Sequence, residues 1–279
     1  MYAYDGTLQS SDVSIKYIEP NVQHDLTIVD KCCTLNNMAI DPSKTVCMTI
    51  VPQRKLSKLI ELSLSVQGIT LQSVETHRLL GVHLDKNLTW NIHIDKLCKQ
   101  VNIKINLLKR ISHFLTLDIR NVFYTGYIPS VIHAFIVCGI GNKTNSNRII
   151  KLQKRAARFV LKQTFKTSSK LIFNELKCLS FPTMCIYYTN VMIFISLNNQ
   201  TPTYVKELLT FSNNSLYNLR FTVKKSIVND KPNSKFKSNT FSYFGIKTWN
   251  ELPKCIINSP SVGSFKILLR SFLRSYEYQ

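Results

Sequence analysis

The chain has 279 residues, is 44% hydrophobic and carries 36 Lys and Arg against 16 Asp and Glu, a formal net charge of +20 at pH 7. This composition excludes a disordered or fibrous chain and predicts a globular protein with a sizeable core. The charge is uneven, because residues 119–279 contain 23 basic and 5 acidic side chains. Such a field attracts nucleic acid or an anionic membrane surface, and charge that serves only solubility is the alternative.

Membrane insertion and secretion are not predicted. Two long stretches without charged side chains, 121–142 and 178–205, are interrupted by proline and asparagine, so we predict buried helices there. Residues 1–12 have neither the basic nor the apolar region of a secretory signal. The eight cysteines include no pair with the two-residue gap of a zinc or redox motif. We therefore predict reduced thiols in a cytoplasmic or nuclear protein that has no membrane partner.

The N-terminal part of the chain predicts mixed structure. Residues 1–8 suit a strand and a turn, and apolar residues then recur every three or four positions over 14–37, which predicts an amphipathic helix. After a turn at 41–43, alternating residues 46–50 predict a half-buried strand. Two more strand-like runs, 62–66 and 73–84, are joined through Gly68. We therefore expect a helix and a small antiparallel sheet up to about residue 86.

The remainder of the chain is predicted to be mainly helical. Residues 90–111 place six apolar side chains within about 80° of a helical wheel: Trp90, Ile94, Leu97, Val101, Ile105 and Leu108. Further helices are expected at 117–140, with a bend or break near Pro129, and at 147–163, 171–176, 184–197, 204–209, 240–252 and 261–276. The predicted fold class is α+β, in which a small antiparallel sheet precedes a mainly α-helical region.

The helix expected at 147–163 carries a cationic ridge. At 100° per residue, five cations fall within about 80°, and we define the ridge by them: Arg148, Lys151, Arg155, Arg158 and Lys162. Like charges at these spacings repel by a few tenths of a kcal/mol per pair, and a polyanion would relieve that repulsion. We predict that the ridge binds RNA or DNA through phosphates, independently of sequence. An ordinary solvated helix face is the alternative, although such a face usually mixes both signs.

Five blocks of sequence point to a known family when they are taken together. They are MYAYDGT from Met1, LNNMAIDPSKTVCMTI from Leu35, HRLLGVHLDKNLTWNIHI from His77, RIIKLQKRAARFVL from Arg148, and FSYFGIKTWNELP from Phe241 with Ser264-Phe265-Lys266 after it. In this order they resemble the C-terminal part of a non-LTR (LINE, jockey-like) retrotransposon reverse transcriptase. The resemblance covers essentially the whole chain and implies RNA-directed DNA polymerisation as the parent activity. It also implies a palm remnant (1–51), a primer-grip hairpin region (52–89), a helical thumb (90–200) and a basic C-terminal region (201–279).

The resemblance implies an incomplete catalytic site. Tyr2, Ala3 and Asp5 match three positions of the family's Tyr-X-Asp-Asp turn, whereas Tyr4 stands at its first aspartate. In the family, that aspartate and another on an upstream strand, which has no counterpart in this sequence, hold two Mg²⁺ ions. Asp5 is then a residual catalytic residue and a lone candidate metal ligand, or only a turn residue. We expect no tightly bound Mg²⁺ and no catalysis by this chain alone.

Two further motifs resemble polymerase parts. Lys44 matches a lysine near the phosphates of the incoming nucleotide, where an ammonium group could donate a proton or screen charge; an exposed turn lysine is the alternative. Leu80, Gly81 and Val82 look like the primer grip, because glycine allows another backbone to approach; a glycine bulge in the sheet is a compatible alternative. One departure is Cys138, where the family commonly has tryptophan.

The predicted function is therefore a fragment of a retrotransposon reverse transcriptase that binds nucleic acid. The alternative is a non-enzymatic nucleic-acid-binding protein derived from a mobile element, in which the palm remnant serves as a scaffold.

Overall fold

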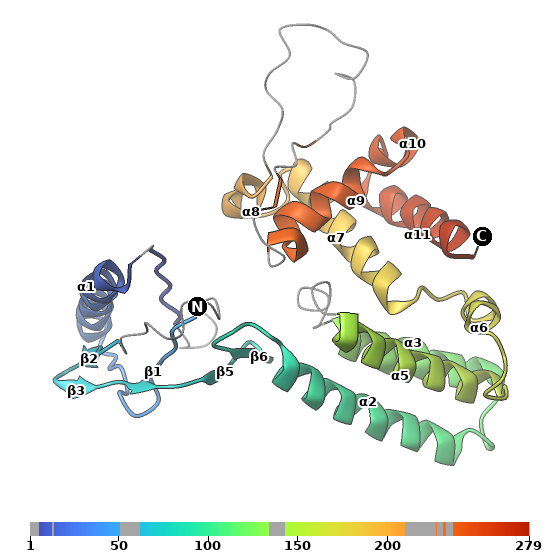
Figure 1. Cartoon of the computed structure of the whole chain (residues 1–279), viewed down its shortest axis with the longest axis horizontal. Coiled ribbons are helices and arrows are strands. Elements are labelled where there is room, and N and C mark those ends of the chain that lie inside the picture. The colour runs from blue at the N-terminus through green and yellow to red at the C-terminus, as the bar shows by residue number, and fades with distance from the viewer. Residues whose placement is uncertain are drawn as a thin grey trace, which may run out of the picture. The chain divides into compact units, whose positions relative to one another are not determined.

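The computed structural model describes residues 6–12, 14–50, 62–133, 143–209, 227, 231–232 and 237–278 (Figure 1). The chain divides into two compact units, residues 1–93 and 94–279. The first unit contains the strands that the structure describes, and the second is helical apart from its connections. The predicted α+β class is confirmed, and the finer division into palm, primer-grip, thumb and C-terminal parts stays a prediction.

The first unit is built on helix α1 (Ile15–Leu35), as the apolar spacing of 14–37 predicts. Its buried residue Leu26 belongs to a small core with Cys47, Leu64, Val66 and Leu71. Next to this core, the Gln23 side-chain amide donates to the backbone oxygen of Ser65 and accepts from its N–H, both at 2.9 Å. The amide thus takes the place of a neighbouring strand and joins the helix to the strand region.

The strands of the first unit form three separate two-stranded pairs. β1 (Val46–Cys47) pairs in parallel with β4 (Gln72–Ser73), whereas β2 (Ser65–Val66) pairs with β3 (Ile69–Thr70), and β5 (Thr76–Leu79) with β6 (Val82–Asp85), both antiparallel. The two hairpins agree with the expected antiparallel arrangement. The parallel pairing of β1 with β4 differs from it, because alternation along a strand does not reveal the direction of its partner.

Three long helices begin the second unit. α2 (Asn91–Ile111) starts at the end of the first unit and buries the predicted face: Ile94, Leu97, Val101, Ile105 and Leu108. Trp90, expected on that face, precedes the helix with a φ of 64°. α3 (Leu117–His133) continues through Pro129 to His133 without a break. α5 (Lys143–Leu161) packs against α3 and α7 (Phe181–Leu197).

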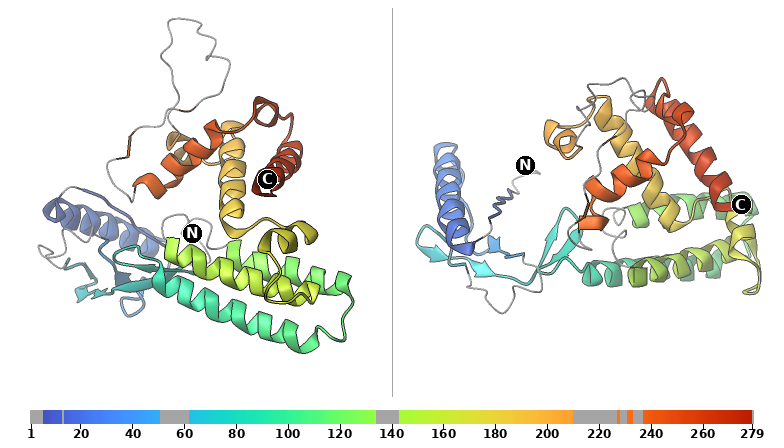
Figure 2. Two further views of the ribbon diagram at one scale, coloured as in Figure 1. Left: turned by 45° about the vertical axis from the view of Figure 1, so that its right-hand side comes forward. Right: turned by 45° about the horizontal axis from the view of Figure 1, so that its top comes forward.

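The remaining helices of the described part pack on α7 or on the helices next to it. They are α6 (Ser169–Glu175), α8 (Thr203–Glu207), the short η2 (Lys237–Asn239), the π-helix η3 (Phe241–Gly245), α9 (Ile246–Asn250), α10 (Lys254–Ile257) and α11 (Val262–Tyr278). α7 is apolar on all sides, the composition of a helix in the interior. It lies between α9 and α11 (Figure 2) and contacts both.

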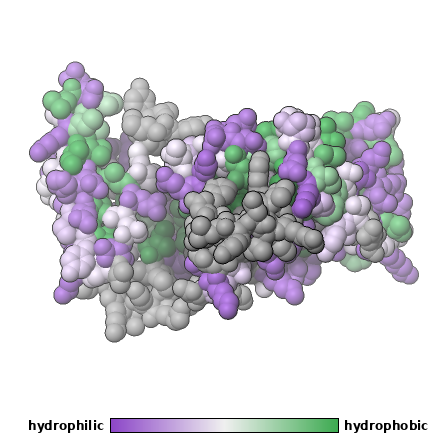
Figure 3. Space-filling model, turned by 90° about the horizontal axis from the view of Figure 1, so that it is seen from above, coloured by the Kyte–Doolittle hydropathy of each residue, from purple (hydrophilic) through white to green (hydrophobic). Residues whose placement is uncertain are grey.

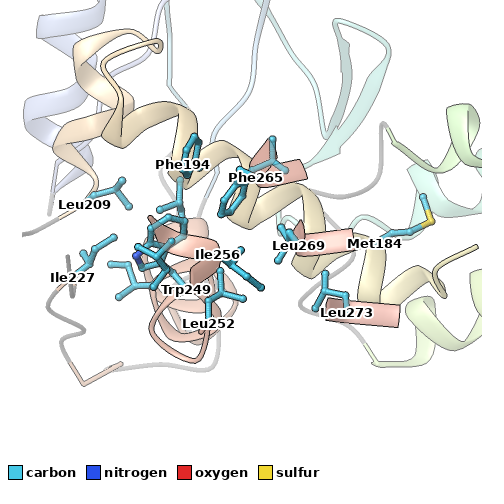
Figure 4. Close-up of a cluster of buried hydrophobic side chains, with 14 of the residues drawn as sticks. Met184, Phe194, Leu209, Ile227, Trp249, Leu252, Ile256, Phe265, Leu269 and Leu273 are labelled. Atoms are coloured by element: carbon cyan, nitrogen blue, oxygen red, sulfur yellow. The ribbon is translucent and has the colours of Figure 1, made fainter. Parts of the chain in front are cut away.

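Aromatic side chains from three helices form the centre of this core (Figure 4). The rings of Phe194 on α7 and Phe265 on α11 are stacked, with centroids 4.2 Å apart and planes 17° apart. Trp249 on α9 is fully buried, with its ring centroid 5.8 Å from that of Phe265. Large aromatic side chains bury the most apolar area, so this cluster contributes strongly to the stability of the core. It also joins helices that are far apart in the sequence.

The block FSYFGIKTWNELP contributes to this core rather than to a surface site. The side-chain amide of Asn250 donates to the backbone oxygen of Ile227 at 2.9 Å and accepts from its N–H at 3.3 Å. Gly245 lies against α7: a Cβ added there would be 2.9 Å from Thr189 Cγ2 and 3.1 Å from Ile193 Cδ1. The residues of the block are therefore needed for close packing and backbone pairing.

The described residues bear on two expectations, the absence of a membrane-spanning helix and the reduced state of the cysteines. None of the helices in the described part combines the length and the apolar character that crossing a bilayer requires. Every described cysteine is a free thiol, with Cys47, Cys98, Cys178 and Cys185 buried.

Replacement of Gly245 by alanine should destabilise the second unit by about 1–3 kcal/mol, because the new methyl group would overlap the buried side chain of Thr189. Gly263 is the matched control, since a Cβ there would be 3.8 Å from its nearest neighbour, Ser261 Oγ, within helix α11. Gly263→Ala should stabilise the protein by about 0.4–1 kcal/mol. Urea unfolding of both variants measures the difference, and an unchanged midpoint for Gly245→Ala would contradict the close packing.

Candidate nucleic-acid interface

The predicted metal site does not fall within the described residues. Asp5 and its neighbours Tyr2, Ala3 and Tyr4 lie outside them. Among the residues that are described, no group of three or more His, Cys, Asp and Glu side chains could hold a metal ion. Mg²⁺ needs several oxygen ligands, and the candidate Asp5 is not among the described residues, so the expectation that no Mg²⁺ is tightly bound stays a prediction.

Lys44 lies in a turn that is organised by Asp41. The Asp41 carboxylate accepts hydrogen bonds from the Ser43 hydroxyl at 2.6 Å and the Ser43 N–H at 3.0 Å, and these bonds lower the pKa of Asp41. Lys44 Nζ is 3.3 Å from Asp41 Oδ2, and 86% of its side chain is exposed. The turn at 41–43 is confirmed, and the nucleotide-phosphate role of Lys44 stays a prediction.

The primer-grip motif forms the tip of the β5–β6 hairpin. Leu79 pairs with Val82, and the two residues between them, Leu80 and Gly81, have φ angles of 47° and 86°. Positive φ at both positions is the type I′ turn, which suits the twist of a hairpin. Gly81 therefore lies in the turn and not in a bulge within the strand. Leu80 is 71% exposed at this tip, and contact with a primer stays a prediction.

A single buried carboxylate holds the connection from this hairpin to α2. Asp85 accepts from the N–H groups of Asn87 at 3.2 Å, Thr89 at 2.9 Å and Trp90 at 2.8 Å, and from the Thr89 hydroxyl at 3.1 Å. Leu88 and Trp90 in this connection have positive φ angles of 50° and 64°, which non-glycine residues rarely adopt. The four hydrogen bonds offset this strain and fix the start of α2.

His93, on the first turn of α2, is 5% exposed and faces the hairpin. Its Nδ1 accepts a hydrogen bond from the backbone N–H of His83 at 3.4 Å. Burial, and to a smaller extent the charge of His83, lower the pKa of His93. The neutral imidazole is therefore the form that the fold favours.

We expect the first unit to lose stability as pH falls from 7.5 to 5.5, because the unfolded chain, where histidine has its ordinary pKa of about 6.5, takes up the proton more readily than buried His93. Urea unfolding at both pH values should show a smaller loss for His93→Gln than for the wild type. The exposed His24 provides the control, and His24→Gln should behave as the wild type does. An equal loss in all three proteins would assign the pH dependence to other groups.

The cationic ridge lies opposite the buried face of α5. The buried residues are Asn145, Ile149, Gln153, Ala156, Ala157 and Val160. Gln153 fixes this orientation, because its amide donates to the backbone oxygen of Leu179 at 2.8 Å and accepts from the N–H of Phe181 at 2.8 Å. Both backbone groups that pair with Gln153 lie at the start of α7. The cations that α5 carries on the other side are therefore directed away from the core.

Two arginines of the ridge contact α2, which the helical wheel did not predict. Arg148 forms an ion pair with Asp95 at 2.5 Å, and this hydrogen bond raises the pKa of Arg148. Arg155 donates to the side-chain oxygens of Asn102 at 3.3 Å and Asn106 at 3.4 Å. The exposed Lys99 stands on the same row of α2 as these partners, so both helices place cations along this surface.

The far end of the ridge departs from the expected helix. α5 ends at Leu161, and the exposed Lys162 follows it with a φ of 52°, so its wheel angle does not apply. Arg158 donates to the backbone oxygen of Thr167 at 3.2 Å, and its Cζ lies 5.0 Å from the ring centroid of Phe165. Lys151 is exposed between the two arginines that contact α2.

Phe165 is a surface feature that the sequence analysis did not single out. It is 86% exposed in the connection between α5 and α6, where Lys162 and Lys166 are also exposed, and the exposed Lys170 follows on the first turn of α6. The sequence offered one signal for this site, a large aromatic residue among lysines in a predicted loop, which is a pattern typical of nucleic-acid binding. Figure 3 shows hydrophilic and hydrophobic residues intermixed over the face of the molecule that it presents.

Comparison with known proteins identifies a distant relative. The chain is 28% identical over 165 residues to the probable RNA-directed DNA polymerase from transposon BS of Drosophila melanogaster. The match covers 57% of this chain and 18% of that protein, so the chain spans less than a fifth of the relative. No protein-family model matches the chain, and no solved structure matches it significantly. The resemblance is thus confirmed at the level of a protein related to retrotransposon reverse transcriptases.

Proposed function

We propose that the chain is the C-terminal part of a non-LTR, jockey-like reverse transcriptase, and that its second unit binds RNA or DNA through phosphates. The observation that carries this proposal is the two-sided α5, which buries a neutral face and exposes a cationic one. The polymerase activity for which the relative is named and the charge of residues 119–279 support the same interpretation. In the family's terms, α2, α3 and α5 would belong to the thumb.

The contacts of the ridge favour phosphate binding over a purely structural role. Arg155 is held by two neutral amides, and Arg158 by a carbonyl oxygen and an aromatic ring. Such partners orient a guanidinium group without cancelling its charge. Arginine has five N–H donors, so donors remain for phosphate oxygens. Among the ridge cations, all of which the structure describes, Arg148 is the one paired with a carboxylate.

Salt dependence tests the ridge. With four uncompensated cations as phosphate contacts, the slope of log affinity against log salt should be about −3.6 on duplex DNA and about −2.8 on single strands. The double variant Lys151→Ala and Lys162→Asn should lower the magnitude on duplex by about 1.8. Alanine preserves the helix and asparagine tolerates the positive φ of residue 162. Fluorescence anisotropy with a labelled oligonucleotide measures the slope.

The matched control removes the same charge elsewhere in the second unit. Lys254 on α10 and Lys266 on α11 are exposed, and their replacement by alanine should leave the slope close to that of the wild type. Equal reduction by both double variants would show attraction by diffuse charge in place of contacts on the ridge. A wild-type protein that binds no nucleic acid at low salt would refute the proposed function.

Primer extension with Mg²⁺ separates a polymerase from a non-enzymatic protein derived from a mobile element. Tyr4 favours the non-enzymatic alternative, because by the resemblance it replaces a metal-binding aspartate of the family's turn. We expect no nucleotide incorporation, and none after Tyr4→Asp, because the restored carboxylate and Asp5 alone do not supply the several oxygen ligands that two Mg²⁺ ions need. Magnesium-dependent extension by either protein would contradict this prediction.

A further inference from the structure

We propose that the loop of residues 162–168 is a stacking platform for an unpaired nucleobase, so that the chain prefers single-stranded nucleic acid to duplex. The inference rests on the proposed function of α5 and adds the class of substrate to it. Phe165 is its central residue, because this ring is 86% exposed directly beyond the end of the ridge.

One face of the Phe165 ring is covered by a cation. The Arg158 guanidinium carbon lies over the ring, 5.0 Å from its centroid, at a distance typical of a cation–π contact. Since Phe165 remains 86% exposed, its other face is open to solvent. A nucleobase that bound to the open face would leave the Phe165 ring between the base on one side and the Arg158 guanidinium group on the other. All three groups are planar.

The loop is ordered by its own hydrogen bonds. The N–H of Gln163 donates to the backbone oxygen of Arg158 at 3.0 Å, and the N–H of Thr167 donates to that of Thr164 at 3.2 Å. The hydroxyl groups of Thr164 and Thr167 are 3.4 Å apart, and Arg158 also donates to the Thr167 carbonyl. The platform is therefore organised before binding, which reduces the entropy that association costs.

The charge around the ring matches a nucleic-acid backbone. Lys162 and Lys166 are exposed on the same connection, Lys170 is exposed on the first turn of α6, and the ridge continues along α5. Stacking tolerates any base, since every base has a π-face, and phosphates on either side of a stacked base would meet the lysines. In a duplex the faces of the bases are already stacked on each other. The ring can therefore add affinity for single strands, but not for the interior of a duplex.

A second exposed aromatic residue lies at the same end of these helices. Phe114, in the connection between α2 and α3, is 80% exposed and contacts His113, with ring centroids 3.9 Å apart. Arg120 at the start of α3 donates to the backbone oxygen of Phe159 near the end of α5 at 3.4 Å. Figures 1 and 2 show both connections at this end. An unpaired strand would thus meet two aromatic rings there.

The experiment compares variants of Phe165 in the full chain on two probes, a labelled single strand of about 20 nucleotides and its duplex. Phe165→Ala should weaken binding to the single strand roughly 5- to 150-fold, the loss expected for one stacked base. The salt slope should not change, because the ring carries no charge. Phe165→Trp should bind as the wild type does, and duplex binding by both variants should stay within about twofold of the wild type.

Two controls make the result specific to stacking. Leu171 on α6 is 63% exposed, and Leu171→Ala removes an exposed apolar side chain without a ring, so it should leave affinity unchanged. A strand that contains abasic sites should bind the wild type as weakly as the normal strand binds Phe165→Ala. This result would support the platform.

The failures are distinguishable. Wild-type affinity of Phe165→Ala for the single strand, while the Lys151 and Lys162 variant lowers the salt slope, would overturn the platform and leave the proposed function standing. Equal weakening on both probes would also overturn it and would assign Phe165 to the shape of the loop. No binding by the wild type to either probe would overturn both proposals.

Discussion

The buried amide of Gln153 joins α5 to the start of α7 and decides which side of α5 faces solvent. The side chain is 1% exposed, and both of its polar ends are paired with backbone groups of Leu179 and Phe181. Loss of such a partner leaves a buried donor or acceptor unpaired, which costs about 1–3 kcal/mol. α7 in turn is the surface on which α9 and α11 pack. The packing of α5 against the start of α7, and with it the direction of the cationic ridge, therefore depends on this contact together with the other buried residues of α5.

The same physical solution recurs elsewhere in the chain. Gln23 pairs with both backbone groups of Ser65, and Asn250 pairs with both backbone groups of Ile227. A carboxamide carries a donor and an acceptor side by side, so it can satisfy a peptide group that lacks a partner in a sheet. With strand pairs of only two to four residues, such amides supply connections that a longer sheet would otherwise provide.

Local periodicity predicted much of the fold, because a helix of 3.6 residues per turn leaves a direct record of its buried face. The faces of α2 and α5 were predictable on this basis. Contacts between distant residues leave no such record: Arg148 and Asp95 are 53 positions apart, and nothing near either residue indicates the pair. The end of α5 was also missed, since Lys162 adopts a positive φ without the glycine that usually marks it. Of the candidate site, the cations were predicted from the sequence, whereas their partners and Phe165 were not predicted.

The residues that carry the family resemblance differ in their physical role from the residues that catalysis would need. In the block FSYFGIKTWNELP, Gly245 and Trp249 are buried and Asn250 pairs with backbone groups, so the resemblance in this block reflects packing. A core tolerates little change of shape, and a sequence that keeps such residues keeps the fold whether or not it keeps an activity. The departure that matters for catalysis is Tyr4, which by the sequence resemblance occupies the position of a metal-binding aspartate of the family. Kinship with a polymerase is therefore consistent with a chain that binds nucleic acid without copying it, and its function has to be argued from its surface.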